Sequence, residues 1–111
     1  MSVYKLVVMT TPVEGREDDY NQWYQGIHIP QVLTIPGMQG AQRFKATRSL
    51  NDRKPYPYLA IFDIETDNIA GVFAEMGRRA QANEITRCDA VDPNSYVVTY
   101  EALGPRTQAR S

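Results

Sequence analysis

Apolar and polar positions alternate with the period of a β-strand in four parts of the chain, residues 3–10, 38–47, 56–64 and 95–103. The first part is rich in β-branched and aromatic residues, which favour strands. Its alternation separates two sets of side chains onto opposite faces, Tyr4, Leu6 and Val8 against Lys5, Val7 and Met9. Both sets are largely apolar, so we expect this strand to be buried on both sides.

Helical spacing marks a segment that we expect to form a helix from about residue 16 to residue 26. Tyr20, Trp23, Tyr24 and Ile27 follow the i, i+3, i+4, i+7 rule and therefore share one face. His28 lies four residues beyond Tyr24 and is expected on the same inward side. The helix is expected to stop abruptly after residue 26, because two prolines and a glycine follow it, Pro30, Pro36 and Gly37.

A second helix is expected to begin near Asp67, a residue type that suits the N-cap position. Glu75 and Arg79 stand four residues apart on its outer side, where they can form an ion pair. The apolar stripe of this helix has helical spacing, with members Ile69, Val72, Phe73, Met76 and Ala80.

The resulting order, strand, helix, strand, strand, helix, strand, predicts a ferredoxin-like α+β fold with a four-stranded antiparallel sheet and both helices on one face. We assign residues 1–104 to this domain and residues 105–111 to a flexible, polar C-terminal tail. The other face of the sheet would leave an apolar patch too large for a soluble monomer. We therefore expect a homodimer joined through the sheet face.

Composition excludes several classes of partner. The 111 residues suffice for one domain, and twelve basic against thirteen acidic residues give a net charge of -1. No long run of one sign exists, which argues against a nucleic-acid or acidic-membrane partner. The chain shows no signal-peptide pattern and no apolar run of roughly 20 residues, so we expect a cytoplasmic protein. The lone Cys88 fits a reducing compartment.

The stretch from Trp23 to Gly37, WYQGIHIPQVLTIPG, followed by Ala41 to Phe44, AQRF, resembles the pattern of the EthD-like branch of the dimeric α/β-barrel superfamily. The resemblance implies the ferredoxin-like fold and the dimer. It is less specific for the reaction, because the wider superfamily includes isomerases, polyketide cyclases, cofactor-free monooxygenases and haem enzymes. The chemistry therefore has to be argued from the site.

His28 and Tyr24 are the candidate catalytic residues. An imidazole that titrates near neutrality can accept and return a proton, and Tyr24 could orient it or bind a substrate oxygen. Arg43, if it points inward, could hold a carboxylate or an enolate. The remaining candidates would form flat apolar walls of a pocket between sheet and helices, Trp23, Tyr58, Phe62 and Tyr96.

Each candidate also has a purely structural interpretation. His28 could cap the last carbonyls of its helix, Trp23 could be core, and Arg43 could be a solvated or interfacial ion-pair partner. Asp63 as a base and Cys88 as a nucleophile are open but weaker alternatives.

The sequence contains neither the ligands of a four-coordinate zinc site nor a phosphate-binding loop nor a serine elbow. We therefore expect no cofactor. Three functions remain. The preferred one is a cofactor-free lyase, isomerase or cyclase that acts on a small aromatic or polyketide-like oxygenated metabolite. The others are a non-catalytic ligand-binding protein of a catabolic pathway and a redox enzyme, either a small-molecule monooxygenase or a protein with haem on His28. The short helix leaves little room for haem.

Overall fold

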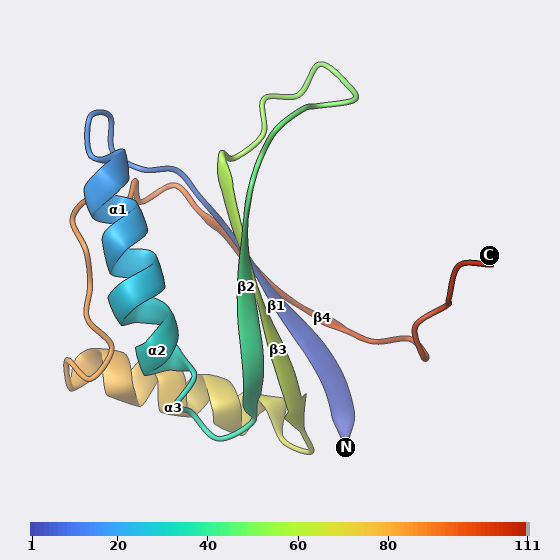
Figure 1. Ribbon diagram of the computed structural model, residues 1–111. Coiled ribbons are helices and arrows are strands. Elements are labelled where there is room, and N and C mark those ends of the chain that lie inside the picture. The colour runs from blue at the N-terminus through green and yellow to red at the C-terminus, as the bar shows by residue number, and fades with distance from the viewer. Residues whose placement is uncertain (111) are drawn as a thin grey trace.

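The computed structural model describes residues 1–110 and contains one four-stranded antiparallel sheet with the strand order β2-β3-β1-β4. The strands are β1 (Ser2–Thr10), β2 (Met38–Lys45), β3 (Tyr58–Thr66) and β4 (Tyr96–Glu101). The helical segments are α1 (Glu17–Trp23), η1 (Tyr24–His28), α2 (Ile29–Val32) and α3 (Ile69–Gln81). All helices lie on one side of the sheet (Figure 1). The ferredoxin-like α+β fold expected from the sequence is therefore confirmed.

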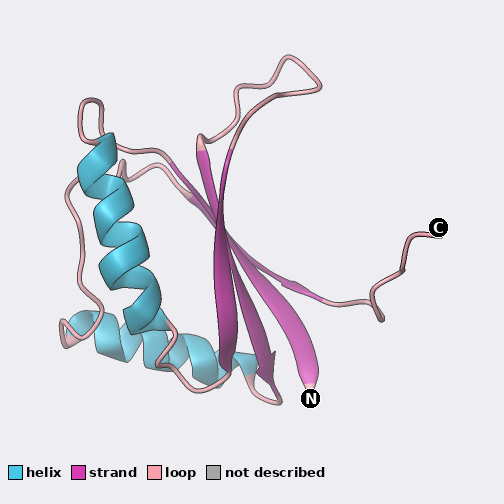
Figure 2. Ribbon diagram, in the orientation of Figure 1, coloured by secondary structure: helices cyan, strands magenta, loops and turns pink. Residues whose placement is uncertain are grey.

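The alternation of each strand matches the two sides of the sheet. On the side of the helices, Leu6 pairs with Phe62 and Val8 with Ala60. Leu6, Phe62 and Ala60 are buried there, together with residues of the helices. The other side carries no helix, as Figure 2 shows. The predicted separation of the two faces of β1 is thus correct. The expected burial of β1 on both sides is not seen within residues 1–110, since Val3 on the uncovered side is 42% exposed.

The first helix is longer than the sequence predicts. The segments α1, η1 and α2 follow one another without a break, and we call residues 17–32 the helical rod. The rod passes through Pro30 because its middle is a π-helical turn, in which the Ile29 N–H donates to the Tyr24 carbonyl five residues earlier. Pro30 itself stands in the first turn of α2, where a missing N–H costs little.

The wide turn also changes which residues face the sheet. Ile27, expected on the inward stripe, is 45% exposed. Tyr20 and Tyr24 are buried as expected, at 1% and 3% exposure, and the ring of His28 packs against the core residue Phe62. The i→i+5 closure turns the residues beyond Tyr24 away from the regular α-helical positions, so Ile27 leaves the stripe.

Helix α3 begins one residue later than predicted. Asn68, and not Asp67, is the N-cap, and its Oδ1 accepts a hydrogen bond from the Gly71 N–H at 3.0 Å. The apolar stripe packs on the sheet with Val72 buried, and the predicted pair of Glu75 and Arg79 forms at 2.8 Å.

A proline sets the start of the third strand. Strand β3 begins at Tyr58, two residues later than expected, because Pro57 has no N–H to donate to the ladder. Its carbonyl still accepts a bond from Ala46 at 2.8 Å.

The chain leaves the sheet after β4. Residues 102–110 form no helix or strand and are exposed, and Ser111 of the expected tail lies outside the described residues. No helix within residues 1–110 has the length and apolarity to cross a bilayer.

Candidate functional site

His28 lies at the end of η1 within a group of aromatic rings. Its ring stacks on the indole of Trp23, with centroids 4.6 Å apart and an angle of 25° between the planes. Tyr24 approaches it nearly perpendicularly at 5.0 Å, and Phe62 of β3 does so at 6.4 Å. We call Trp23, Tyr24, His28 and Phe62 the imidazole cluster. The helix continues beyond His28, so His28 does not cap the end of the helical rod.

The Nδ1 atom of His28 is buried and has no hydrogen-bond partner within residues 1–110. A buried polar atom without a partner costs about 1–3 kcal/mol, so such an atom calls for an explanation. Burial also lowers the pKa of His28 from 6.5 to about 4, because the charged form loses its hydration. The imidazole is therefore neutral at pH 7, which differs from the near-neutral titration expected from the sequence.

The principal cavities lie away from His28. The largest, about 800 Å³, is found where the β2–β3 hairpin meets the loops before α1 and β4, and its lining includes Thr11, Lys54, Tyr56 and Asp92. None of the five principal cavities along residues 1–110 is lined by a member of the imidazole cluster. The aromatic surroundings expected for His28 are present, but the pocket expected between sheet and helices is not among these cavities, because the rings pack directly against the imidazole.

Arg43 of β2 points to the same side of the sheet. Its guanidinium carbon lies 4.8 Å from the ring centroid of Tyr24 and 5.5 Å from those of Tyr20 and Tyr58. The Nη2 atom donates to the Asn21 Oδ1 at 2.5 Å. We call Arg43 and these three tyrosines the arginine cage. Cation–π contacts of this kind stabilise a guanidinium without a counter-ion.

No carboxylate within residues 1–110 forms an ion pair with Arg43. The nearby Glu17 is engaged elsewhere, since it accepts a hydrogen bond from the Tyr58 hydroxyl and lies 3.8 Å from the Lys45 ammonium. Asn21 also donates to the Tyr58 hydroxyl at 3.2 Å. The positive charge of Arg43 is thus held by ring faces and one amide, and an anionic group could still bind it.

Tyr24 connects the imidazole cluster with the arginine cage, because its ring contacts both His28 and Arg43. Burial raises the pKa of Tyr24 well above its ordinary value, so the phenol stays protonated. Tyr24 contacts the imidazole through its aromatic ring rather than through its hydroxyl.

Six of the seven predicted site residues gather on the side of the helices: Trp23, Tyr24, His28, Arg43, Tyr58 and Phe62. Tyr96 does not join them. It pairs with Met9 in the sheet, on the uncovered side, and its hydroxyl contacts that of Tyr100. Both faces of β4 carry apolar residues, so alternation alone could not decide which way Tyr96 points.

The two weaker candidates form their own polar contacts with residues other than His28. Asp63 lies on the uncovered side of the sheet and pairs with Lys5. Cys88 is half-buried in the loop before β4, where its sulfur accepts a weak hydrogen bond from the Ala90 N–H at 3.4 Å.

The sequence did not indicate that Gln31 and Thr86 contribute to the site. The Gln31 side chain exchanges two hydrogen bonds with Thr86, and the Trp23 indole donates to the Thr86 carbonyl at 3.1 Å. These contacts join residues that are more than fifty positions apart, and neither residue belongs to a recognisable motif.

No protein-family model and no curated protein matches the sequence. Solved structures match over nearly the whole chain. An EthD-like protein from Ralstonia eutropha JMP134 superposes with a TM-score of 0.64 at 18% identity, covering 96% of this chain and 97% of that one. The haem degrader MhuD from Mycobacterium tuberculosis, determined with two haems in its active site, gives 0.66 at 15%, covering 95% and 99%.

A monooxygenase candidate from Shewanella loihica PV-4 gives a TM-score of 0.62 at 12% identity, covering 95% of this chain and 99% of that one. Likeness at these identities establishes a common fold and leaves the chemistry open. The structural neighbours also include a second EthD-family protein, from Bacillus halodurans. The chain therefore has the ferredoxin-like fold found in EthD-family proteins, as its sequence resemblance implied.

Proposed function

We propose that this protein is an enzyme that performs acid/base chemistry on a small, flat, oxygenated molecule, with His28 as the proton acceptor. The observation that carries the proposal is the buried Nδ1 of His28, which lies in an aromatic cluster. Among the described residues this nitrogen has no hydrogen-bond partner, and Arg43, which contacts the same ring of Tyr24, has no carboxylate partner. A ligand that donates a proton to this nitrogen would remove the cost of leaving it unpaired.

The chemistry follows from the charges. A neutral imidazole can take a proton from a carbon next to a carbonyl or from a phenol, and the product is an enolate or phenolate. Arg43 would stabilise that anion, and the anion would in turn favour the imidazolium form of His28. The rings of Trp23, Tyr58 and Phe62 would provide flat apolar contacts for the ligand. Lyase, isomerase and cyclase reactions all share this first step.

The test is deuterium incorporation. The protein is incubated in D₂O with a panel of phenols, hydroxylated aromatic ketones and β-keto acids, and the ligands are analysed by mass spectrometry. We expect incorporation or a new product with at least one compound, and a loss of about 10²-fold or more in His28→Gln. Circular dichroism checks that the variant remains folded. A His28→Gln variant with the full rate would refute the role of His28.

The same panel tests the alternative of a non-catalytic ligand-binding protein. That function predicts binding, seen as a shift of the melting temperature, without deuterium incorporation or product. A small-molecule monooxygenase is a further alternative, which the monooxygenase candidate with this fold favours. It predicts ligand-dependent consumption of O₂, measured with an oxygen electrode.

Haem deserves a separate test because MhuD shares the fold and holds haem. A neutral histidine with a free nitrogen has suitable donor chemistry. The arrangement does not fit haem, however, because the indole of Trp23 stacks on the imidazole at 4.6 Å and none of the five principal cavities along residues 1–110 is lined by the imidazole cluster. We therefore derive no step through haem. A visible spectrum recorded after incubation with hemin checks this.

We also propose that the protein is a homodimer joined through the uncovered side of the sheet. This side is apolar along its centre, and Phe44 and Tyr100 there are 41% and 50% exposed. Light scattering after size exclusion is expected to give twice the chain mass of 12.6 kDa. Ile61→Glu places a charge on this side and should give the single-chain mass. A wild-type protein that is monomeric at micromolar concentration would contradict the dimer.

A further inference from the structure

We infer that Gln31 is a positioning residue for His28, acting through Thr86 and the indole of Trp23. The inference deepens the proposed function, since it concerns access to the same imidazole. It involves the segment from residue 83 to residue 91, which follows α3 and runs beside the helical rod (Figure 1, orange). We call this segment the strap.

The ends of the strap are anchored to the body of the protein. Ile85 is 8% exposed and Ala90 is fully buried. The Ala90 carbonyl accepts from the Val13 N–H at 2.7 Å, and Asp89 forms an ion pair with Arg16 at 2.8 Å. Between these anchors, Thr86 is exposed. Hydrogen bonds to the rod hold its hydroxyl, N–H and carbonyl in place.

Gln31 supplies two of these bonds. Its Nε2 donates to the Thr86 hydroxyl at 2.9 Å, and its Oε1 accepts from the Thr86 N–H at 2.7 Å. The amide group of glutamine provides both a donor and an acceptor, so one side chain fixes both the place and the orientation of Thr86. An apolar side chain of similar length could make neither bond.

The third bond leads to the imidazole. The Trp23 Nε1 donates to the Thr86 carbonyl at 3.1 Å, and the same indole is stacked on His28 at 4.6 Å. The position of Thr86 thus sets the position of the indole, and the indole covers one face of the imidazole. A flat ligand can stack on this face of His28 only if it displaces the indole. The hydrogen bond between Trp23 and Thr86 then has to break or the strap has to move.

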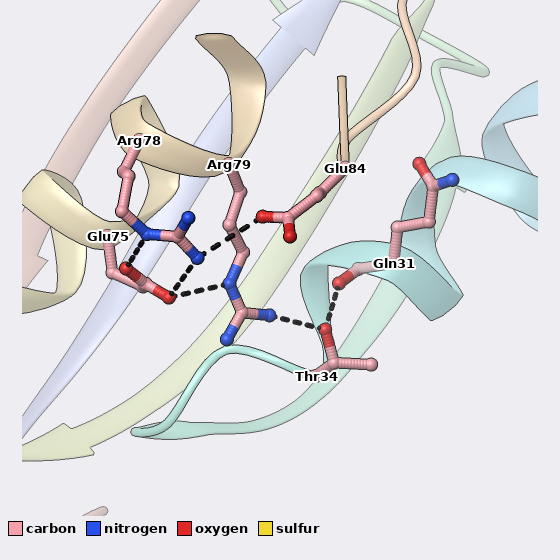
Figure 3. A network of polar contacts seen from close by, with 6 residues as sticks. All are labelled: Gln31, Thr34, Glu75, Arg78, Arg79 and Glu84. Carbon is pink, nitrogen blue, oxygen red and sulfur yellow. Dashed lines mark hydrogen bonds and ion pairs between the residues drawn. The ribbon is translucent and has the colours of Figure 1, made fainter. Parts of the chain in front are cut away.

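The backbone of Gln31 is itself held in place. The Thr34 hydroxyl donates to the Gln31 carbonyl at 2.7 Å and accepts from Arg79 of α3 at 2.7 Å, while the side chain of Gln31 points away from this network (Figure 3). Arg78 of α3 pairs with Glu84 at the start of the strap at 3.2 Å. The rod and the strap are therefore both fixed to α3. The bonds between Gln31 and Thr86 connect the rod and the strap directly to each other.

The chain offers a clean test, because it contains one histidine and one tryptophan. Diethyl pyrocarbonate modifies accessible neutral imidazoles, and acrylamide quenches accessible indoles. We expect Gln31→Leu to raise the rate of His28 modification at least about fivefold, the effect of losing roughly two hydrogen bonds. Acrylamide quenching of Trp23 should rise in the same variant.

Matched variants distinguish this effect from a general loss of stability. Gln25→Leu makes the same exchange at an exposed position of the rod. In this variant His28 should be modified at the wild-type rate. Gln31→Glu keeps an acceptor for the Thr86 N–H and can accept from its hydroxyl, so it should restore nearly the original rate. If Gln31→Leu fails to fold by circular dichroism, Thr86→Val, which loses only the hydroxyl bond, takes its place.

Equal modification rates in Gln31→Leu and Gln25→Leu, or a faster rate without greater quenching of Trp23, would overturn the inference. The measurement needs no substrate. A failure here would leave the deuterium test of His28 unaffected, and an inactive protein would leave this result standing.

Discussion

His28 and Arg43 both pack against the ring of Tyr24, one from the helical rod and the other from β2. The imidazole stacks on an indole, its Nδ1 has no polar partner in the part of the chain that the structure describes, and burial lowers its pKa to about 4. The guanidinium lies over three tyrosine rings and donates to Asn21 at 2.5 Å. The surroundings of His28 therefore remove its charge, whereas those of Arg43 accommodate a charge.

The difference comes from geometry. The face of an aromatic ring is electron-rich and attracts a cation placed over it. Arg43 has such faces and a polar partner, so it remains charged without a carboxylate. His28 has its rings packed closely and nothing to hydrogen-bond at Nδ1, so the neutral form is favoured. A site with one neutral base and one cation is suited to forming and holding an anion. Substitutions at the shared ring and at each group show whether the two environments are independent.

The largest effect is expected for Tyr24→Ala, because this buried ring is shared by both groups. We predict a loss of about 3–4 kcal/mol in the free energy of unfolding, measured in urea. Water entering the space should also raise the pKa of His28 towards its ordinary value, which NMR of the single imidazole would report. Tyr100→Ala, at a position 50% exposed, is the control and should cost less than about 1 kcal/mol. A Tyr24→Ala variant that leaves the imidazole titration unchanged would contradict the shared role.

The next effect is a dependence of stability on pH. The folded protein holds His28 with a pKa of about 4, and the unfolded chain has the ordinary value of 6.5. Below pH 6.5 the unfolded state binds the extra proton more readily, so stability is full above that pH and falls as the pH drops towards 4. We predict that wild type loses about 2 kcal/mol more than His28→Gln between pH 7 and pH 5. Parallel pH profiles for the two proteins would mean that His28 titrates normally.

A smaller effect is expected for Arg43→Met, which keeps most of the side-chain volume and removes the charge. We predict a loss of about 1 kcal/mol, measured in urea, from the cation–π contacts and the bond to Asn21. The titration of His28 should remain the same. Lys45→Met is the control, because Lys45 lies on the same side of β2 and is exposed. Its loss in the free energy of unfolding should be smaller. If Arg43→Met shifts the pKa of His28 as far as Tyr24→Ala does, the charge of Arg43 influences the titration of His28.

Much of the architecture could be predicted from the sequence because it depends on local patterns. Alternation predicted which residues share each face of β1, and the spacing of Tyr20 and Tyr24 placed both on the aromatic stripe. The site was harder because it depends on contacts between distant residues. The bonds between Gln31 and Thr86 involve a loop whose path is set by α3 and by buried anchors.

Pro30 shows the same limit on a local scale. A proline usually ends a helix, and the sequence alone offers no sign that a π-turn would carry the rod past it. Once the Ile29 N–H reaches back to the Tyr24 carbonyl, the proline falls at the start of a new α-helical turn and is tolerated. The length of the rod, and the presence of Gln31 on it, follow from this one irregular turn.

The smallest predicted effect tests that turn directly. A regular helix would bury Ile27 on the aromatic stripe, whereas η1 leaves it 45% exposed, and Ile29 is only 6% exposed. Ile27→Ser should therefore change the free energy of unfolding by no more than about 0.5 kcal/mol, since isoleucine and serine have similar helix propensities. Ile29→Ser should cost about 3 kcal/mol, because it removes buried apolar volume. A loss for Ile27→Ser in urea as large as that for Ile29→Ser would contradict the π-turn, because it would mean that Ile27 is buried. Residues 27 and 29 lie on nearly opposite faces of a regular α-helix, so a rod without the π-turn would bury Ile27 and expose Ile29.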